Sequence, residues 1–597
     1  MSNIYRDVTL NQVSEQDIGK TIRVAGWVEN IRDHGGVSFI DLRDMYAVMQ
    51  IVIRDGKLLE GIRKEQAITV EGLIEKRDEE TYNPKIPTGT IELDAKEVTV
   101  LGEVYSQLPF EVMTSKSVVH EDVRLKYRYL DLRNQKVKDN IIFRSKVISY
   151  LREKMTSMGF LELQTPILCA SSPEGARDYI VPSRKFKGKF YALPQAPQQY
   201  KQLLMVSGFD KYFQIAPCFR DEDARAARSP GEFYQLDFEM SFATQEDVFA
   251  VGEEVLSSVF EKFAPEGSVV TKAPYPIISY KQAMLEFGSD KPDLRFDMHF
   301  YDISDLLRDT GFKVFRNVLD NGGIVKAITV KGDAAIPRRE LDGLVDYVGN
   351  YGAKGLAWIG LNKDGSLKCQ ITKFLGEDKI REIGKFCEAE NGDLILIIAD
   401  KPKVVAQALG ELRLEMARRM NLIDENEFCF RWVTDFPMFE YSEEDKRWVA
   451  EHHPFTAPRD EDVQYLLTDP SKVYAKAYDM VLNGVEAGGG SLRIYQEELQ
   501  EKVFKAIGIT HEEAQEKFGF LLDAFRYGAP PHAGIALGLD RLVMLMLRLG
   551  SIRDVIAFPK TQSAIDQMTQ APSEVVDMQL KELHIRVDVK KEKNLLI

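Results

Sequence analysis

The chain has 597 residues with 78 Lys and Arg against 93 Asp and Glu, which gives a formal net charge of −15. A chain of this length is expected to divide into several domains, and 44% hydrophobic residues can build substantial cores. The acidic balance argues against a nucleic-acid partner unless a basic surface is concentrated locally.

The cysteines and the N-terminus indicate the compartment. The five cysteines show no CxxC pairing, which predicts neither a zinc site nor a disulfide framework, but buried thiols in a reducing cytosol. They are Cys169, Cys218, Cys369, Cys387 and Cys429. The opening MSNIYRDVTL lacks an apolar signal core, and no run approaches the roughly 20 apolar residues of a membrane span. We therefore expect a cytoplasmic protein without a membrane partner.

Residues 1–104 alternate like strands in five segments: TIRVAGWVENI, GVSFIDLRD, AVMQIVIRD, AITVEGLIEKR and GTIELDAKEVTVL. Five short strands with one helical insert predict a small β-barrel of the OB-fold kind, whose sheet face commonly holds single-stranded nucleic acid. An ordinary β-barrel without that role fits the same pattern.

Beyond the barrel, residues 105–140 are charged and weakly periodic and are expected to form a hinge. Residues 141–288 and 426–560 carry the motifs described below and are expected to form one catalytic domain in two parts. Between them, residues 289–425 have their own alternating and helical runs, which predicts an inserted α+β domain. Residues 561–597 are expected to be a C-terminal extension. The predicted fold class is multidomain α+β.

Two separate segments place arginines where a phosphate could bind. The chain alternates from Tyr212 to Arg220 and again from Phe233 to Phe242, which predicts a hairpin with Gln235, Asp237 and Glu239 on one face. Far downstream, a Gly-Leu-Asp-Arg tetrad ends in Arg541. A guanidinium grips phosphate oxygens through paired donors, whereas lysine offers a point charge. The chain contains no Walker-type or strand-linked GxGxxG alternative, although FRDE alone would also fit a salt-bridged surface hairpin.

Together, FRDE, GEFYQLDFEM and GIALGLDRL resemble the second and third motifs of class II aminoacyl-tRNA synthetases. The amphipathic stretch 141–158 followed by GFLELQTPIL is similar to the first motif, in which Pro166 would end a strand at the dimer interface. The resemblance narrows to bacterial-type aspartyl-tRNA synthetases over essentially the whole chain. It does so through SPEGARDYIVP (172–182), QQYK (198–201), EHHPFTAP (451–458) and YDMVLNGVEAGGGSLRI (478–494), and through the insertion.

The resemblance implies that L-aspartate attacks the α-phosphate of ATP and that the aspartyl group then passes to tRNA. Arg220, Glu222 and Arg541 would carry the catalytic role, and Asp479 and Glu486 would hold Mg²⁺. The residues expected to bind ATP are Arg220, Asp221, Glu222, Phe233, Glu486, Gly538, Leu539, Asp540 and Arg541.

The same resemblance implies a pocket in which Lys201 and Arg493 embrace the substrate's side-chain carboxylate, so that an amide substrate is rejected. Asp237 and Gln198 would engage the ammonium group. The full set expected to bind aspartate is Glu174, Gln198, Gln199, Tyr200, Lys201, Arg220, Gln235, Asp237, His452 and Arg493.

For tRNA, the resemblance implies that the barrel reads the anticodon through Arg32, Phe39 and Gln50. His34, followed by glycine, is typical of relatives that charge tRNA(Asn) as well as tRNA(Asp), whereas Glu80, the second position in that pattern, fits neither group. Charging tRNA(Asn) would require a partner amidotransferase to convert the product. The family also implies a homodimer.

Four alternatives stay open on the sequence. The chain could charge tRNA(Asp) alone, or it could be a lysyl or asparaginyl enzyme of the same fold. A non-catalytic RNA-binding paralogue would be expected to have lost Arg220, Glu486 and Arg541, all of which are present. A structural or chaperone-like dimer has the least support.

Overall fold

The computed structural model describes residues 3–113, 118–171, 176–222 and 231–588. The chain divides into two compact units, Met1–Glu111 and Val112–Ile597. In the described residues no helix is both long and apolar enough to cross a membrane. None of the five cysteines forms a disulfide. Cys218, Cys387 and Cys429 are buried as expected, but Cys169 and Cys369 are only half-buried.

The first unit is a closed five-stranded barrel in the order β1-β2-β3-β5-β4. The strands are β1 (Thr21–Asp33), β2 (Ser38–Arg43), β3 (Val48–Ile53), β4 (Ala67–Lys76) and β5 (Ile91–Gly102). Alternate positions such as Val24, Val28 and Ile40 fill its core, as a half-buried strand requires. The expected OB-type barrel is confirmed, although short 3-10 turns such as Gly56–Leu59 replace the predicted helical insert.

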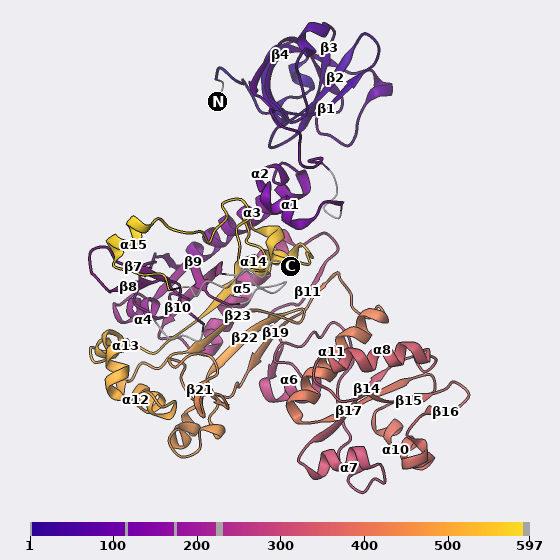
Figure 1. The fold of residues 1–597 in the computed structure, drawn as a ribbon, viewed down its shortest axis with the longest axis vertical. Coiled ribbons are helices and arrows are strands. Elements are labelled where there is room, and N and C mark those ends of the chain that lie inside the picture. The colour runs from indigo at the N-terminus through magenta and orange to yellow at the C-terminus, as the bar shows by residue number, and fades with distance from the viewer. Residues whose placement is uncertain (1–2, 114–117, 172–175, 223–230, 589–597) are drawn as a thin grey trace. The chain divides into compact units, whose positions relative to one another are not determined.

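The second unit is built on an eight-stranded sheet in the order β12-β19-β22-β23-β24-β10-β9-β6, shown in Figure 1. Its strands are β6 (Leu161–Glu162), β9 (Lys211–Arg220), β10 (Gly231–Ser241), β12 (Ile277–Ser279), β19 (Phe430–Thr434), β22 (Ala477–Leu482), β23 (Val485–Leu492) and β24 (His532–Gly538). Neighbouring strands are antiparallel except for the edge pairs β6–β9 and β12–β19. The predicted hairpin is thus β9–β10, near one edge of the sheet.

Helices cover this sheet. Apolar side chains of α3 (Gln135–Ser157), α5 (Gln245–Phe263) and α14 (Leu539–Met546) form one core with alternate residues of β10. A second core lies around α12 (Glu497–Ala506) and α13 (His511–Phe525), and α4 (Gln198–Val206) contacts β10 and α13. Smaller elements are α1 (Glu121–Lys126), α2 (Arg128–Asp131), β7 (Ile180–Pro182), β8 (Phe190–Ala192), β11 (Val269–Val270), α6 (Tyr280–Phe287), β18 (Glu427–Phe428), β20 (Phe439–Ser442), β21 (Arg447–Ala450) and α15 (Asp577–Leu583).

The inserted segment has its own antiparallel sheet, in the order β13-β14-β17-β15-β16. One core on it includes residues of α8 and α11, and another includes residues of α7 and α10, so helices cover both faces. The strands are β13 (Tyr301–Asp302), β14 (Ile324–Val330), β15 (Ala357–Leu361), β16 (Leu367–Cys369) and β17 (Leu394–Asp400). The helices are α7 (Lys313–Asp320), α8 (Arg338–Gly349), α9 (Thr372–Leu375), α10 (Glu377–Phe386) and α11 (Pro402–Arg419).

Two local expectations differ from the structure. The segment 105–140 contains α1, α2 and the start of α3 and is not a simple hinge, because Arg128 is buried and donates to the carbonyls of Ile556 and Ala557 at 2.9 Å each. The strand expected to end at Pro166 covers only Leu161–Glu162. The hydrogen bonds that join β6 to β9 end with the one from the Leu163 N–H to the Phe213 carbonyl.

Candidate functional site

A hollow of about 120 Å³ lies where β9, β10, β23 and β24 meet the start of α14. Seven of the nine residues expected to bind ATP line it, together with Gln235. They are Arg220, Glu222, Phe233, Glu486, Gly538, Asp540 and Arg541. Segments more than 300 residues apart in the chain thus contribute to one surface.

The two arginines are held in defined positions. The Arg220 guanidinium lies 5.0 Å from the centroid of the Phe233 ring, and its Nε donates to the Gln195 carbonyl at 3.3 Å. Arg541 donates through Nη1 to the backbone carbonyl of Glu486. Each guanidinium therefore has an anchor within the protein, while both side chains line the hollow and can donate to an anion there.

Of three further residues expected to contact ATP, Leu539, Asp540 and Asp221, only Asp540 lines the hollow. Leu539 is fully buried in the core. Asp540 accepts from Arg144 at 2.5 Å, and burial raises the pKa of this carboxyl against the opposing pull of Arg144. Asp221 is exposed and does not line the hollow, and its N–H donates to the Arg177 carbonyl at 3.1 Å.

Asp479 and Glu486 converge on the place where Gly489 has no side chain. A Cβ at Gly489 would lie 2.6 Å from Asp479 Oδ1 and 3.9 Å from Glu486 Oε1. Burial and the neighbouring Glu486 raise the pKa of Asp479 well above its usual range, although Lys291 and Arg541 oppose them, as expected for two carboxylates that lie close together. The described residues contain no cluster of three or more potential metal ligands. Two carboxylates are a donor set that suits Mg²⁺, which takes one or two carboxylates and completes its shell with phosphates and water.

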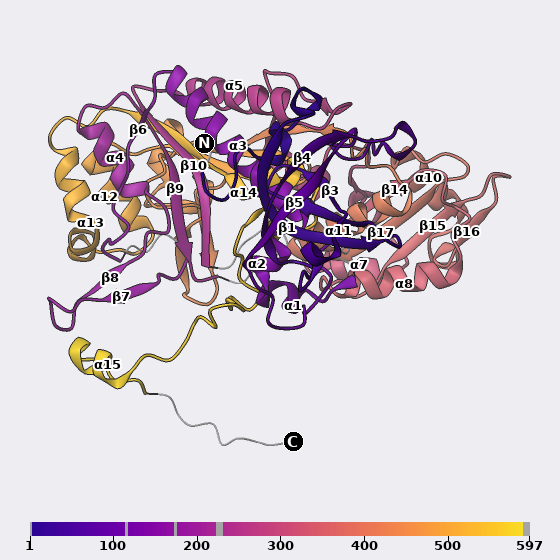
Figure 2. The same ribbon diagram turned by 90° about the horizontal axis from the view of Figure 1, so that it is seen from above.

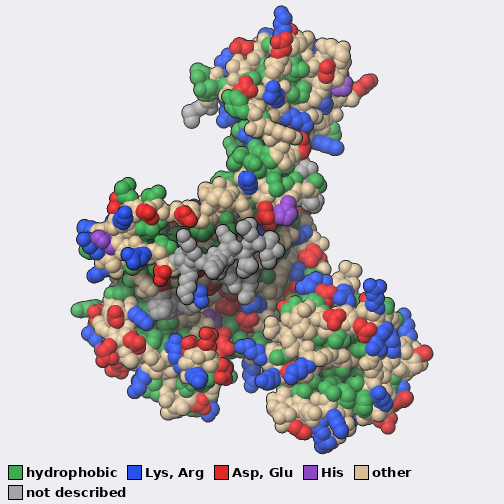
Figure 3. Space-filling view, viewed as in Figure 1, with side chains coloured by type: hydrophobic (Ala, Val, Ile, Leu, Met, Phe, Trp, Pro, Cys, Tyr) green, Lys and Arg blue, Asp and Glu red, His purple; other side chains and the backbone are tan. Residues whose placement is uncertain are grey.

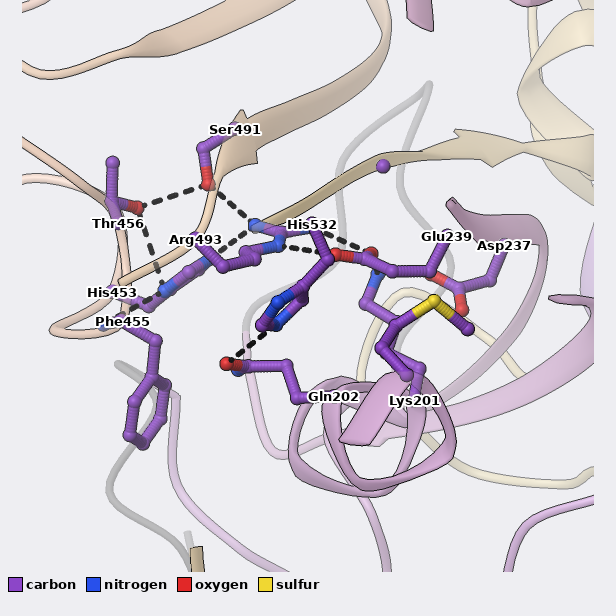
Figure 4. A network of polar contacts seen from close by, with 12 residues as sticks. Lys201, Gln202, Asp237, Glu239, His453, Phe455, Thr456, Ser491, Arg493 and His532 are labelled. Carbon is purple, nitrogen blue, oxygen red and sulfur yellow. Dashed lines mark hydrogen bonds and ion pairs between the residues drawn. The ribbon is translucent and has the colours of Figure 1, made fainter. Parts of the chain in front are cut away.

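Beside this hollow, a buried network joins β10 to the end of β23 (Figure 4). Arg493 donates to both carboxylate oxygens of Glu239, at 2.9 and 3.1 Å. Lys201 Nζ lies 2.6 Å from Asp237 and 3.2 Å from Glu239. Burial alone would raise the pKa of Glu239, but Arg493 and Lys201 outweigh it and lower the pKa to about 2. The positive charges of Lys201 and Arg493 thus offset the negative charges of the two acids, Asp237 and Glu239, within the protein.

Three buried polar atoms around Lys201 lack a hydrogen-bond partner among the described residues: Asp237 Oδ2, Gln198 Nε2 and Gln202 Nε2. Asp237 is fully buried, Lys201 engages its Oδ1, and its Oδ2 accepts no hydrogen bond from any described residue. Gln198, one turn before Lys201 on α4, has a buried Nε2 that likewise donates to no described residue. Buried polar atoms without partners are costly. An unpaired acceptor and an unpaired donor therefore mark a place for a polar ligand.

His453 completes the network as a neutral side chain. Its Nε2 lies 2.9 Å from Arg493 Nη1, a group that can only donate, so this nitrogen must accept. Burial and the adjacent guanidinium lower the pKa of His453 well below its usual range. Arg493 also donates to Ser491, which accepts a bond of 3.3 Å from Thr456. The orientation of Arg493 is therefore fixed from both sides.

The remaining residues expected to bind aspartate are dispersed. Gln199 and Tyr200 line a separate, smaller hollow with Cys169 and Asp178, because they point away from the Lys201 face of α4. Gln235 lines the hollow that holds Arg220. His452 Nε2 lies 4.0 Å from Asp479 Oδ1, beside the paired carboxylates. Glu174 lies outside the described residues.

The barrel has its own hollow, which contains Arg32, His34, Phe39 and Gln50. Arg32 donates to Asp41 at 2.6 Å and to Gln50 at 3.1 Å, and the His34 ring meets Phe39 edge-on at 5.6 Å between centroids. Glu80 does not line this hollow.

The sequence assigned no role to several members of these sites. It placed Glu239 on one face of β10 with Gln235 and Asp237, but gave it no part in binding. No local signal indicated Glu92, whose carboxylate accepts from Gln50 at 2.8 Å in the barrel hollow. Gln195 also gave no signal. Its side chain donates to the Ala176 carbonyl at 2.8 Å and accepts from the Ala176 N–H at 3.1 Å.

The sheet with its two arginines and paired carboxylates, together with the separate barrel, has the architecture of a class II tRNA synthetase. Residues 120–562 match the family described as tRNA synthetases class II (D, K and N), and residues 22–101 match the OB-fold nucleic acid binding domain. The chain belongs to this synthetase family.

Individual relatives agree with this membership. The chain is 52% identical over 595 residues, 99% of each chain, to the aspartate–tRNA(Asp/Asn) ligase of Caldanaerobacter subterraneus. It is 50% identical to the aspartate–tRNA ligase of Staphylococcus aureus, over 96% of this chain and 98% of the relative. The fold is similar to that of asparaginyl-tRNA synthetase from Pyrococcus horikoshii with asparaginyl-adenylate, with a TM-score of 0.57 at 19% identity, covering 94% of this chain and 100% of the other.

Replacing Gly489 by Ala should impair nucleotide chemistry without unfolding the protein. The new Cβ would lie 2.6 Å from Asp479 Oδ1 and must displace this carboxylate. A shift of about 1 Å in a catalytic group can cost about a hundredfold in rate, so amino-acid-dependent pyrophosphate exchange should fall by that order. Gly343→Ala is the control, because nothing lies within 4 Å of its added carbon. Equal exchange rates in the two variants would contradict the role given to Gly489.

Three histidines, of which His532 is fully buried and His452 and His453 are partly buried, should make stability depend on pH. Burial lowers the pKa of His452, His453 and His532 in the folded protein. The unfolded chain therefore binds more protons below pH 6.5, and the free energy of unfolding should fall as the pH drops from 7 to 5. Each histidine contributes at most about 1.4 kcal/mol per pH unit.

Thermal unfolding at pH 7, 6 and 5 measures this slope. In His532→Asn the slope should be smaller, and the new amide can still donate to the Pro530 carbonyl, which lies 2.8 Å from His532 Nδ1. The exposed His584→Asn serves as control. An unchanged slope in His532→Asn would argue against a buried neutral imidazole.

Proposed function

We propose that the protein is an aspartate–tRNA ligase, which joins L-aspartate to tRNA through an aspartyl-adenylate at the expense of ATP. The observation that carries this proposal is the buried Lys201–Asp237–Glu239–Arg493 network with its unpaired Asp237 Oδ2. A free amino acid brings an ammonium group that can donate to that oxygen and a side-chain carboxylate that can accept from the two cations. Relatives at 50–52% identity bear names for the same activity.

In the first step, the aspartate α-carboxylate attacks the α-phosphorus of ATP and pyrophosphate leaves. The protein needs no nucleophile of its own, only positioning and charge neutralisation. Arg220, which lies over the Phe233 ring, donates to the α-phosphate, while Arg541, which also lines the hollow, holds the outer phosphates. Mg²⁺ held by Asp479 and Glu486 would neutralise further phosphate charge. The unpaired Gln198 Nε2 fits an α-carboxylate oxygen better than the ammonium group first expected.

Selection of aspartate over asparagine follows from the donors in the network. Lys201 and the Arg493 guanidinium can only donate, so a carboxylate satisfies them, whereas an amide would turn its NH₂ group against one of them. Glu239 and His453 fix Arg493 on the other side and prevent it from turning away. In the second step, a ribose hydroxyl of the terminal tRNA adenosine attacks the mixed anhydride, and AMP leaves.

For the tRNA, we propose dual use of tRNA(Asp) and tRNA(Asn). His34 is exposed in the barrel hollow next to Phe39, where an anticodon base can stack. The relative from Caldanaerobacter subterraneus is named for both tRNAs. An amidotransferase would then convert the aspartyl-tRNA(Asn), and we expect the enzyme to act as a homodimer.

Replacing Arg220 by Lys should abolish most adenylate formation while leaving the fold intact. A point charge cannot reproduce bidentate phosphate binding, so aspartate-dependent pyrophosphate exchange should fall about 10²–10³-fold. Arg308→Lys, an exposed arginine of the insertion, is the matched control. Exchange kinetics like those of the control would refute the role of Arg220.

Charging assays with purified tRNA(Asp) and tRNA(Asn) transcripts test the function at two levels, with asparagine and lysine as control amino acids. Aspartate should be attached to both tRNAs, and His34→Leu should reduce charging of tRNA(Asn) by at least about tenfold while sparing tRNA(Asp), as expected for loss of about 1–3 kcal/mol at one base. Charging of tRNA(Asp) alone would refute the proposal that the enzyme uses both tRNAs. No transfer of aspartate would refute the enzyme assignment.

A further inference from the structure

The β7–β8 hairpin is a basic element on an acidic protein. Its tip, residues 183–189, has the sequence SRKFKGK. All four of its cations are exposed, and Phe186, Phe190 and Tyr191 around it are 36–51% exposed. Basic and acidic side chains are interspersed over the face shown in Figure 3. The hairpin tip carries cations alone. They are Arg184, Lys185, Lys187 and Lys189.

Both arms of the hairpin begin beside the end of β9, next to Arg220, which lines the catalytic hollow. On one arm, the Arg177 carbonyl accepts from the N–H of Asp221 at 3.1 Å, next to Arg220. On the other arm, the Pro194 carbonyl accepts from the N–H of Phe219 at 2.9 Å. The hairpin is thus rooted at the end of β9 that presents Arg220, and it projects from the body of the unit, as Figures 1 and 2 show.

The tip is an ordered turn with uncompensated charge. The Ser183 N–H donates to the Lys189 carbonyl at 2.9 Å, and the Ser183 hydroxyl accepts from the Phe186 N–H at 3.1 Å. Arg184 pairs with Glu582 of α15 at 3.4 Å. No described carboxylate lies within ion-pair distance of the other three cations, which are Lys185, Lys187 and Lys189. Like charges held close together are unfavourable unless a polyanion binds them.

We propose that the β7–β8 hairpin binds the phosphate backbone of the tRNA acceptor arm and guides the 3′ end towards Arg220. This inference rests on the proposed function, which requires a long polyanion to approach the catalytic hollow. About ten residues separate Arg177 from the tip, so at about 3.3 Å per residue the lysines can reach up to about 30 Å from the reacting end. Exposed aromatic rings among cations also suit stacking on unpaired bases.

A second copy of this chain is the competing occupant of the hairpin. Its own net charge is −15, but an acidic protein surface is far less densely charged than a nucleic-acid backbone. The regular row of phosphates on an RNA therefore matches the tip better.

The test uses the full-length triple variant Lys185→Gln, Lys187→Gln, Lys189→Gln. Its KM for tRNA should rise about tenfold, and the slope of log(kcat/KM) against log salt should become shallower by about two to three units, because each phosphate contact contributes about 0.7–0.9. Aspartate-dependent pyrophosphate exchange, measured without tRNA, should stay unchanged. Binding of an acceptor-arm minihelix should weaken, while binding of an anticodon stem-loop should not.

The control variant Lys272→Gln, Lys281→Gln, Lys517→Gln removes the same charge from exposed lysines elsewhere in the second unit. It should leave KM and the salt slope as in the unaltered protein. An unchanged KM and slope in the hairpin variant, with exchange intact, would overturn the hairpin inference alone. So would an altered oligomeric state by sedimentation, which would assign the tip to a second copy. No exchange in the unaltered protein would overturn the proposed function and this inference with it.

Discussion

The ion pairing of Arg493 with Glu239 inside the sheet is the interaction on which the site depends. Both side chains are almost fully buried, and leaving either one unpaired would cost about 3–5 kcal/mol. Because Lys201 and Asp237 join the same network, its total charge is balanced before any ligand arrives. An incoming amino acid therefore finds fixed donors and one fixed acceptor rather than mobile charges, which is the preorganisation that selective binding needs.

Strand β10 gives this network its place. Leu236, Phe238 and Met240 point into the core shared with α3, α5 and α14, so the intervening side chains must face the opposite side of the sheet. That side carries Phe233 beside Arg220 and, further along, the two buried acids. One strand thus contributes side chains to both the nucleotide part and the amino-acid part of the site. A shift of its register by one residue would turn these side chains to the other face of the sheet.

The sequence predicted the elements and the residue types of the site, but not their pairing. Alternation over 212–220 and 233–242 located β9 and β10 to within two residues at each end, because period-2 burial is a local property. Nothing local indicates that Glu239 meets Arg493, 254 residues later. The helices α1 and α2 were missed for the same reason, since the contacts of Arg128 lie more than 400 residues away.

The glycines 488–490 of β23 have two different roles. Cβ atoms at Gly488 and Gly490 would lie 2.4 and 2.2 Å from carbonyl oxygens of β24. Those two glycines therefore let neighbouring strands pack together, and only Gly489 faces the carboxylates of Asp479 and Glu486. Tight packing of β23 on β24 holds Glu486 and Arg493, which lie seven residues apart on and just beyond β23, in one rigid piece. The nucleotide and amino-acid parts of the site are consequently fixed relative to each other by backbone contacts.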